Sequence, residues 1–523
     1  MRAERVSGET LAAALLAALS AAVVVVLGPP AIDAPAHLYR TELVREGIHL
    51  WDNLWYAGQY PLASYSFFYY LPAAVVGNVP LVVAAVIVSA ALFSSLLLHE
   101  WGAIGRWPAR AYGILAGGPL LTGTYSYALG LACLLGTLRA LQLGRPRLAV
   151  VLAVLTLGFS PLAFVFLCLA LAAIACSRRE LGPRSVALAL VLIGGVELLA
   201  LVLFRTDATY PFHVWPLLGV LTTSVLGVAI ALRARNGGAL LAFFLLWGVV
   251  CLAAFFIPTP LGSNLTRLRF FVFPLGLLTV LLTGFRPRLL ASTGLALGLV
   301  YTLVPYLLVL PNRSARSDVE EAFWRPAIEF LQRRSTPGFR VEVVPTFDHW
   351  EAYWLPHAGV PLARGWYRQL DVGRNAALYD SGLDARGYES WLRGNGVRFV
   401  LLPATRLDRL GGAAEERLLR SGRSGLVRVA STASWTIWEL PRATPILTGP
   451  APARLTAFEH ERIRGRVGAA GEYLLRVRWT PYWHVTGAAT CVERAPGGLT
   501  RLRASGAGTF ALSSDLRGGR VTC

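Results

Sequence analysis

The sequence predicts a polytopic α-helical membrane protein that ends in a C-terminal region outside the membrane, first α/β and then β-sandwich-like. Composition is the first reason, because 55% of the 523 residues are hydrophobic and 15% are charged, whereas soluble domains carry about 25% charged residues. The second reason is that residues 1–310 contain many apolar stretches of roughly 20 residues, the length that crosses a bilayer. Since lipid cannot satisfy an open backbone, these stretches are expected to be helices.

Eleven apolar segments are expected to cross the membrane. Arginines concentrate in every second loop between them, from Arg2 and Arg5 at the start to Arg286 and Arg288 before the last segment. Because arginine-rich loops stay in the cytoplasm, the N-terminus is predicted to be cytoplasmic in a bacterial plasma membrane. The first long loop and the C-terminal region are then extracytoplasmic. The predicted segments are 11–28, 79–98, 108–125, 126–143, 147–160, 162–176, 186–204, 213–232, 238–257, 270–285 and 288–310.

Two of these regions have a second interpretation. The run 11–28 precedes Ala34-Pro35-Ala36, as a signal peptide would precede its cleavage site. It is longer than the roughly 7–15 residues of a signal's apolar core, so we interpret it as a retained helix. The stretch 148–176 is too short for two full spans, which need about 40 residues. It is interpreted as two short helices meeting at Phe159-Ser160-Pro161, whereas one kinked span would place the C-terminus inside.

The net charge does not indicate a nucleic-acid partner. It is +19, and every basic residue is an arginine. In the membrane region, the topology explains these arginines because they occupy short loops between apolar runs. Membrane lipids are therefore expected partners and nucleic acid is not.

The loop 31–72 contains the first candidate site. Asp33 precedes "APAHLYRTELVRE" and Gly47, which predicts a helix with Asp33 as N-cap, lying along the membrane interface. Asp33 then either caps the helix or serves as a catalytic carboxylate, and it can do both. His37 lies one turn on and Asp52 is a second acid, so both are candidate supporting residues. Asp33 and His37 could also hold a divalent cation, but they offer only two ligands, so no metal site is assigned and no cofactor is required.

Aromatic and amide side chains follow in the same loop. They form an aromatic belt at the membrane interface or offer flat faces and amides to a sugar ring. The candidates for sugar or acceptor contact here are Trp55, Tyr56, Gln59 and Tyr60.

Arginines in the extracytoplasmic loops are unexpected. Arg267 and Arg269 lie in one such loop and Arg40 in another. A guanidinium grips phosphate with two hydrogen bonds, so these three are candidates for binding a lipid phosphate. The alternative is that they extend toward the headgroups or pair with a loop acid. His213, in the aromatic-rich loop 205–215, is a further candidate for sugar contact.

The wording "DAPAHLYR…G…LWDNLWYAGQYPLASYSFFYYLP" resembles the GT-C superfamily of polyprenyl-phosphate-sugar-dependent glycosyltransferases. It looks closest to bacterial membrane proteins filed as 6-pyruvoyl-tetrahydropterin-synthase-related. The layout is also similar to actinobacterial arabinofuranosyl- and mannosyltransferases of the cell envelope. The specific sequence resemblance covers about 45 residues, while the architectural resemblance extends over 1–310.

The resemblance implies an inverting transfer from a polyprenyl-phosphate sugar to an envelope glycan or lipid acceptor. In that superfamily the first-loop acid acts as general base on the acceptor hydroxyl, and Asp33 occupies that position here. Many members carry an acidic pair where this chain has Asp33-Ala34, so the resemblance leaves a metal requirement open. The expected domains are a GT-C-like domain 1–310, an α/β domain 311–440 and a β-rich domain 441–523.

The C-terminal region supplies further candidates. The stretch 347–371 is either a loop with buried aromatics or an acceptor contact, and His357 and Trp366 are its candidate residues. Cys491 and Cys523 are the two cysteines after 310, which makes them a disulfide candidate in an oxidising compartment.

Three functions remain open from the sequence. A glycosyltransferase leads, and a lipid or glycan transporter or flippase is the second. A non-catalytic scaffold for envelope assembly is the third. The sequence contains no Walker A loop, HExxH motif or nucleophile elbow that would indicate another chemistry.

Overall fold

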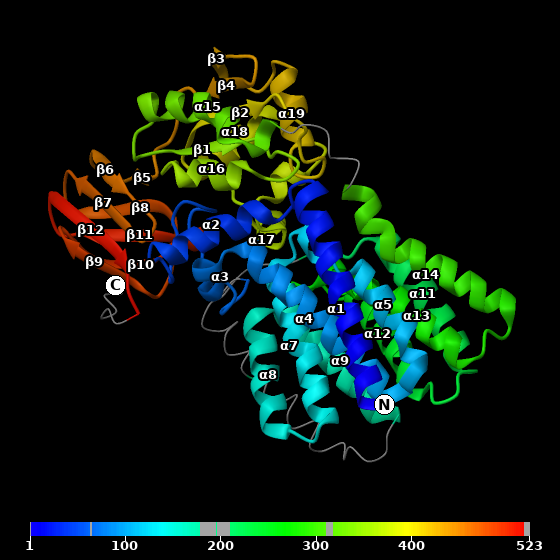
Figure 1. The fold of residues 1–523 in the computed structure, drawn as a ribbon. Helices are drawn as coiled ribbons and strands as arrows, with labels where there is room; N and C mark the ends of the chain where they lie inside the picture. Colours follow the sequence, from blue (N-terminus) through cyan, green and yellow to red (C-terminus); the bar gives the residue numbers. More distant parts are fainter. Residues whose placement is uncertain (1, 63–64, 178–194, 196–209, 310–316, 517–523) are drawn as a thin grey trace. The chain divides into compact units, whose positions relative to one another are not determined.

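The structure is a computed structural model that describes residues 2–62, 65–177, 195, 210–309 and 317–516 (Figure 1). The chain forms two compact units. The first contains Met1–Ala31 and Tyr65–Ser314, and the second contains Ile32–Ser64 and Ala315–Cys523. The C-terminal part of the second unit thus begins at Ala315. The loop that follows the first helix also belongs to this unit.

The first unit is α-helical. Its helices pack side by side, with α1 against α4 and α5, and α11 against α12 (Figure 1). Their bounds are α1 Arg2–Leu27, α3 Tyr70–Val76, α4 Asn78–Trp101, α5 Arg106–Leu115, α6 Gly118–Thr122, α7 Tyr125–Gln142, α8 Pro146–Phe159, α9 Pro161–Ser177, α11 Val214–Ala231, α12 Gly238–Phe256, α13 Arg269–Leu282 and α14 Arg288–Val309.

Six stretches of the described residues are helical, long and apolar enough to cross a membrane, which makes this a membrane protein. They are Ser7–Leu27, Asn78–Thr122, Val214–Ala231, Gly238–Phe256, Gly262–Leu282 and Arg288–Val309. Eleven spans are thus not confirmed. Predicted segment 108–125 is broken into α5 and α6. The predicted segment 186–204 lies almost entirely outside the described residues.

The stretch 148–176 forms two short helices, as predicted. Helix α8 ends at Phe159, Ser160 has extended backbone angles, and α9 begins at Pro161. The Ser160 hydroxyl accepts a hydrogen bond from the Ala163 backbone N–H at 3.2 Å, which satisfies the start of α9. The helices have 14 and 17 residues. At about 1.5 Å per residue, each is shorter than the roughly 30 Å hydrocarbon core.

The second unit begins with a mixed four-stranded sheet in the order β1-β2-β4-β3. Strand β1 (Arg340–Val343) runs parallel to β2 (Val397–Pro403), and β4 (Trp435–Glu439) pairs antiparallel with both β2 and β3 (Val427–Ser431). Apolar side chains of this sheet form cores with the neighbouring helices. These helices are α15 Glu321–Arg334, α16 Glu351–His357, α17 Arg368–Arg374, α18 Ala385–Gly394 and α19 Ala413–Arg420.

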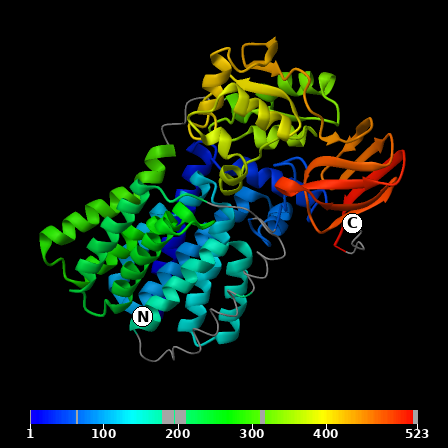
Figure 2. The ribbon, with the colours of Figure 1, turned by 180° about the vertical axis from the view of Figure 1, so that it is seen from behind.

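The C-terminal residues form the predicted strand-rich region. Two four-stranded sheets have the orders β10-β11-β8-β5 and β6-β7-β12-β9, and both are visible from behind in Figure 2. Side chains alternate between buried and exposed along β7 and β8. The strands are β5 Leu447–Thr448, β6 Ala453–Phe458, β7 Arg462–Val467, β8 Gly471–Arg478, β9 Trp483–Gly487, β10 Ala489–Arg494, β11 Leu499–Ala504 and β12 Gly508–Ser514.

The loop after the first helix is part of the second unit's core. Helix α2 (Ala34–Arg45) starts after Asp33 and ends before Gly47, as predicted, but nine of its twelve residues are buried. Its Tyr39 and Leu43 belong to the same apolar cluster as Trp324 and Trp435. Packing in this core accounts for the apolar residues of α2, and its predicted position along a membrane interface stays a prediction.

Candidate functional site

Asp33 is held by a residue far away in the sequence. It occupies the N-cap position of α2, yet its side chain makes no capping hydrogen bond. Instead its Oδ1 accepts a hydrogen bond from the Trp366 indole N–H at 3.1 Å. The carboxylate is half-buried. The predicted capping role is thus wrong for the side chain, whose position is fixed by Trp366.

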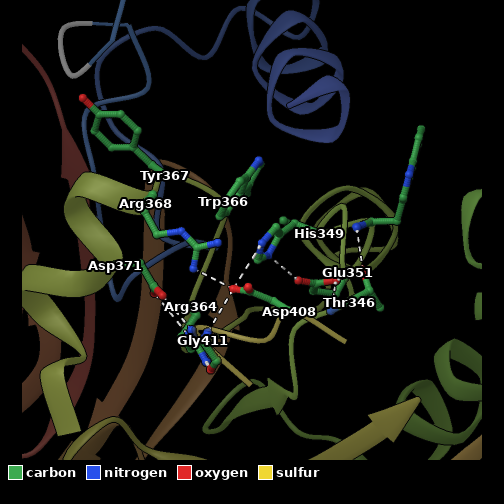
Figure 3. Close-up of polar contacts among 12 residues, drawn as sticks. Thr346, His349, Glu351, Arg364, Trp366, Tyr367, Arg368, Asp371, Asp408 and Gly411 are labelled. Atoms are coloured by element: carbon green, nitrogen blue, oxygen red, sulfur yellow. Dashed lines mark hydrogen bonds and ion pairs between the residues drawn. The ribbon is translucent and has the colours of Figure 1, made fainter. Parts of the chain in front are cut away.

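Trp366 itself stacks on a buried histidine (Figure 3). The rings of Trp366 and His349 are nearly parallel, with centroids 3.4 Å apart. His349 has a positive φ of 61°, which is a strained conformation that typically marks a constrained position. Its Nδ1 lies 3.0 Å from Glu351 Oε1, and Glu351 Oε2 accepts from the Thr346 hydroxyl at 2.7 Å.

A third acid and an arginine complete this group. Asp408 Oδ2 accepts from Arg368 at 2.6 Å and lies 3.7 Å from His349 Nε2. Burial alone would raise the pKa of Asp408, but His349 and Arg368 outweigh it and lower the pKa to about 2. Arg368 also lies 4.8 Å from the Trp366 ring centroid. We call Asp33, Trp366, His349, Glu351 and Asp408 with its partner Arg368 the tryptophan cluster.

A neighbouring cluster gathers three carboxylates around one guanidinium. Arg364 donates to both oxygens of Asp371, at 3.1 and 2.6 Å, and its Nη1 also contacts Glu342 at 3.5 Å and Glu415 at 3.3 Å. All four side chains are buried. We call these four residues the Arg364 cluster; Figure 3 shows its arginine with Asp371 and Gly411.

The protonation of the Arg364 cluster follows from its excess of acids. Burial, and then the charge of Glu415, raises the pKa of Glu342. Burial raises the pKa of Glu415 to about 7. Burial acts the same way on Asp371, but Arg364 outweighs it and holds that pKa below its usual value. A cavity of about 10 Å³ lined by Glu342, Glu351 and Arg364 has room for about one water and not for a sugar.

The free energy of unfolding is expected to decrease as the pH rises from about 4.5 to about 7. The pKa of Glu415 rises from its usual 4.5 to about 7 in the folded chain, so the native state binds more protons than the unfolded state over this window. Each pH unit then costs at most about 1.4 kcal/mol. Chemical denaturation at several pH values measures the slope.

The Glu415→Gln variant is the control for this prediction. Glutamine keeps an acceptor for the Tyr388 hydroxyl, which donates to Glu415 at 2.6 Å, but does not titrate. The slope of the variant should be flatter than that of the parent. Glu342 and His460 also have raised pKa values and leave a residual slope in the same direction. Equal slopes in parent and variant would contradict the assignment to Glu415.

Asp52, predicted as a supporting acid, is fully buried and satisfied. It accepts from the Tyr39 hydroxyl at 3.1 Å, from the Leu54 backbone N–H at 3.0 Å, and lies 3.0 Å from His460 Nδ1. Burial would lower the pKa of His460, but the hydrogen bond to Asp52 outweighs it and raises the pKa. The pairing of His460 with Asp52 was not predictable from the sequence, because the two residues are 408 positions apart.

The other predicted residues of the first loop are also in the core. His37 and Arg40 are each 1% exposed. The Arg40 guanidinium lies over the rings of Trp55 and Tyr367, 5.8 and 5.4 Å from their centroids. All residues from 51 to 60 are buried. The predicted sugar contacts Trp55, Tyr56, Gln59 and Tyr60 are therefore at most 7% exposed.

Three predicted site residues, Arg267, Arg269 and His213, lie in the first unit. Arg267 lies in the 3₁₀ turn Gly262–Leu268, Arg269 begins α13, and both side chains are half-buried. His213 is exposed before α11, and its backbone N–H donates to the Ser263 hydroxyl at 3.2 Å. That hydrogen bond joins the loop of His213 to the one that leads to Arg267.

The remaining candidates lie in the second unit. His357 Nδ1 is 2.5 Å from Glu42 Oε1, which connects α16 to α2. Cys491 is disulfide-bonded, and Cys523 lies outside the described residues. Among the residues that the structure describes, no group of three or more His, Cys, Asp or Glu could hold a metal ion.

Sequence reasoning missed His349, Asp408 and Arg364 as partners of the candidate site. The only signal was the density of His, Trp, Asp and Arg in 347–371, which indicated a special segment without its pairing. Asp408 lies outside that segment and carries no local signal.

Comparison with known proteins leaves the family open. No protein-family model and no curated protein matches this chain. A solved structure of the archaeal oligosaccharyltransferase AglB from Archaeoglobus fulgidus, in complex with an inhibitory peptide and a dolichol-phosphate, is similar with a TM-score of 0.34 and 13% identity. The match covers 75% of this chain and 69% of AglB. A similarity of this size carries no argument about activity.

Proposed function

We propose that this membrane protein transfers a sugar from a polyprenyl-phosphate donor to an envelope glycan or lipid acceptor. The transfer takes place on the outer face of the bacterial plasma membrane. Asp33 acts as general base, and the configuration at the anomeric carbon is inverted. The observation that supports it is the placement of Asp33. Its side chain does not cap α2, is half-buried and accepts a hydrogen bond from Trp366. A carboxylate positioned in this way can take the proton of an attacking hydroxyl.

The other acids of the tryptophan cluster suit this role less well. Glu351 and Asp408 are buried, whereas Asp33 is partly exposed. Asp52 is fully buried among donors from its own loop. Only Asp33 in this group combines partial exposure with a fixed position. A general base of this kind contributes about 10²–10⁴-fold to the rate.

Arg267 and Arg269 are the proposed donor-phosphate residues within the first unit. Both lie at the N-terminal end of α13, where a cation is unfavourable because the helix dipole is positive there. A bound phosphate would compensate this charge and could accept two hydrogen bonds from a guanidinium. Extension toward lipid headgroups is the competing explanation. Arg40 is a weaker candidate because it is buried against two aromatic rings.

Asp33→Asn tests the proposed general base. Asparagine keeps an oxygen that can accept from Trp366 but cannot take a proton, so transfer should fall about 10²-fold. A deletion strain complemented with the variant is assayed by mass spectrometry of its lipid-linked sugars. A polyprenyl-phosphate sugar should accumulate as it does in the uncomplemented strain.

Asp384→Asn is the matched control. Asp384 is also the N-cap of a helix in the second unit, is exposed, and does cap, accepting from the Gly387 N–H at 2.8 Å. Because asparagine caps as well as aspartate, this variant should restore normal lipid-linked sugars. Full transfer by Asp33→Asn at normal protein level would remove Asp33 as the base.

A non-catalytic scaffold is the second candidate. The burial of all residues from 51 to 60 supports it, because a loop used as core needs no substrate to explain its aromatic content. In the same complementation assay, a scaffold predicts that Asp33→Asn behaves like the parent while deletion of the chain still changes the envelope.

A further inference from the structure

One sheet of the strand-rich region exposes a row of arginines. Along β7, Arg462, Arg464 and Arg466 are exposed, while Ile463 and Val467 between and after them are buried. The alternation follows from the strand period of two, which places every second side chain on the same face. Arg454 is exposed on the neighbouring strand β6 and pairs directly with Arg466. We call these four arginines the arginine face.

The arginine face concentrates charge of one sign. Like charges directly opposite each other on paired strands destabilise a sheet, and Arg454 lies opposite Arg466. Arg464 has an ion pair, with Glu459 at 3.0 Å. Arg454, Arg462 and Arg466 have no ion pair with any residue that the structure describes. The fold therefore maintains an unfavourable arrangement that an external anion would relieve.

Protection of a sheet edge does not account for this charge. Edge strands often carry basic residues that prevent pairing with another chain. In the order β6-β7-β12-β9, however, β7 is an interior strand and carries three of the four arginines. Only Arg454, on the edge strand β6, fits the protective explanation.

The other sheet of the same region provides a contrast. On β11, Arg501 lies 3.0 Å from Glu493, and Arg503 lies 2.9 Å from Glu472. These two arginines of β11 are thus each paired with an acid on a neighbouring strand. On β7, by contrast, Arg462 and Arg466 have no ion pair with a residue that the structure describes.

The surroundings of the arginines favour a polyanionic chain of sugars over a membrane or a nucleic acid. Strand β12 places Thr509 opposite Arg466 and Ser513 opposite Arg462, and these hydroxyls suit sugar hydroxyls. From 453 to 514, no described large hydrophobic side chain is exposed. Membrane-surface binding normally uses such anchors, and single-stranded nucleic acid needs aromatic stacking platforms.

We propose that the arginine face binds an anionic glycan polymer, one that carries carboxylate or phosphate groups along its length. Successive arginines on β7 are about 6.6–6.8 Å apart, twice the rise of a strand residue, so a repeating anion can contact more than one. Each guanidinium can hold a carboxylate or phosphate with two hydrogen bonds. This binding site is separate from Asp33 and does not depend on the proposed transfer reaction.

The test measures binding of the full chain, in nanodiscs of neutral lipid, to polygalacturonate and to neutral dextran. The parent should bind polygalacturonate, release it at high salt and ignore dextran. Arg462→Gln/Arg466→Gln should bind at least about tenfold more weakly, since each removes a charge-assisted contact. Arg501→Gln/Arg503→Gln, which removes the same charge from the other sheet, should change binding less than about twofold.

Three results would overturn the proposal. The first is equal weakening by both double variants, which would indicate a general charge effect. The second is parent-like binding by Arg462→Gln/Arg466→Gln. The third is a pair of results in which Arg462→Gln/Arg466→Gln weakens binding to added phosphatidylglycerol vesicles but leaves binding to polygalacturonate unchanged. The arginine face would then bind anionic lipid.

Discussion

Replacing Arg364 by methionine is expected to lower the free energy of unfolding of the second unit by about 3–5 kcal/mol. Arg364 is the single guanidinium that contacts Asp371, Glu342 and Glu415, and all four residues are buried. Methionine fills a similar volume but leaves the carboxylates without their cation. An uncompensated buried charge is far more costly than a lost surface pair, so the effect should be among the largest of any single substitution here.

Tryptophan fluorescence during denaturation in detergent measures this effect. Of the 15 tryptophans, Trp101, Trp107, Trp215 and Trp247 belong to the first unit, so 15 − 4 = 11 report on the second. Arg325→Met is the control, because its pair with Glu321 is exposed on both sides and should contribute less than about 1 kcal/mol. Similar losses in Arg364→Met and Arg325→Met would contradict the role assigned to the Arg364 cluster.

The loss of stability in Arg364→Met should be smaller at acidic pH than at neutral pH. In Arg364→Met, Asp371 loses the partner that holds its pKa below the usual value, so the variant should recover part of its stability when the pH falls toward 5. Adding Asp371→Asn to Arg364→Met should recover part of the loss at neutral pH, because it removes one of the stranded charges.

Features coded by neighbouring residues were predictable from the sequence. Helix α2 begins after Asp33 and ends before Gly47 because an N-cap residue, an early proline and a terminal glycine are all local signals. The turn at Ser160-Pro161 was predictable for the same reason. The division of segment 108–125 into α5 and α6 falls at Gly117-Gly118-Pro119, a local helix-breaking signal that the prediction did not use.

Features that depend on distant contacts were not predictable. The Asp33–Trp366 hydrogen bond joins residues 333 positions apart, and the Asp52–His460 contact joins residues 408 apart. The many aromatic residues in 51–60 do not indicate by sequence alone whether their rings contact a membrane, a sugar or a protein core. Burial decides among these, and burial follows from the strands and helices that arrive from residues beyond 317.

Replacing Trp55 by alanine is expected to cost about 3–5 kcal/mol and to loosen the first loop from the core of the second unit. The Trp55 ring is 0% exposed, stacks on Tyr39 with centroids 4.5 Å apart, and donates from its indole N–H to the Ala352 carbonyl at 3.0 Å. Gly365 also packs closely on the ring, since a Cβ there would come within 2.5 Å of it. Alanine therefore removes a large buried surface and leaves the Ala352 carbonyl without the Trp55 hydrogen bond.

Hydrogen exchange of a peptide covering 49–62 should report the loosening directly, with faster exchange in Trp55→Ala than in the parent. Trp55→Phe is the graded control, because it keeps most of the ring and loses only the indole N–H, so its cost should be nearer about 1–2 kcal/mol. Because Tyr39, stacked on Trp55, lies on the helix that Asp33 begins, the loosened variant should also lose sugar transfer if Asp33 is the base. Unchanged exchange together with full stability in Trp55→Ala would show that the loop does not depend on this residue for its place in the core.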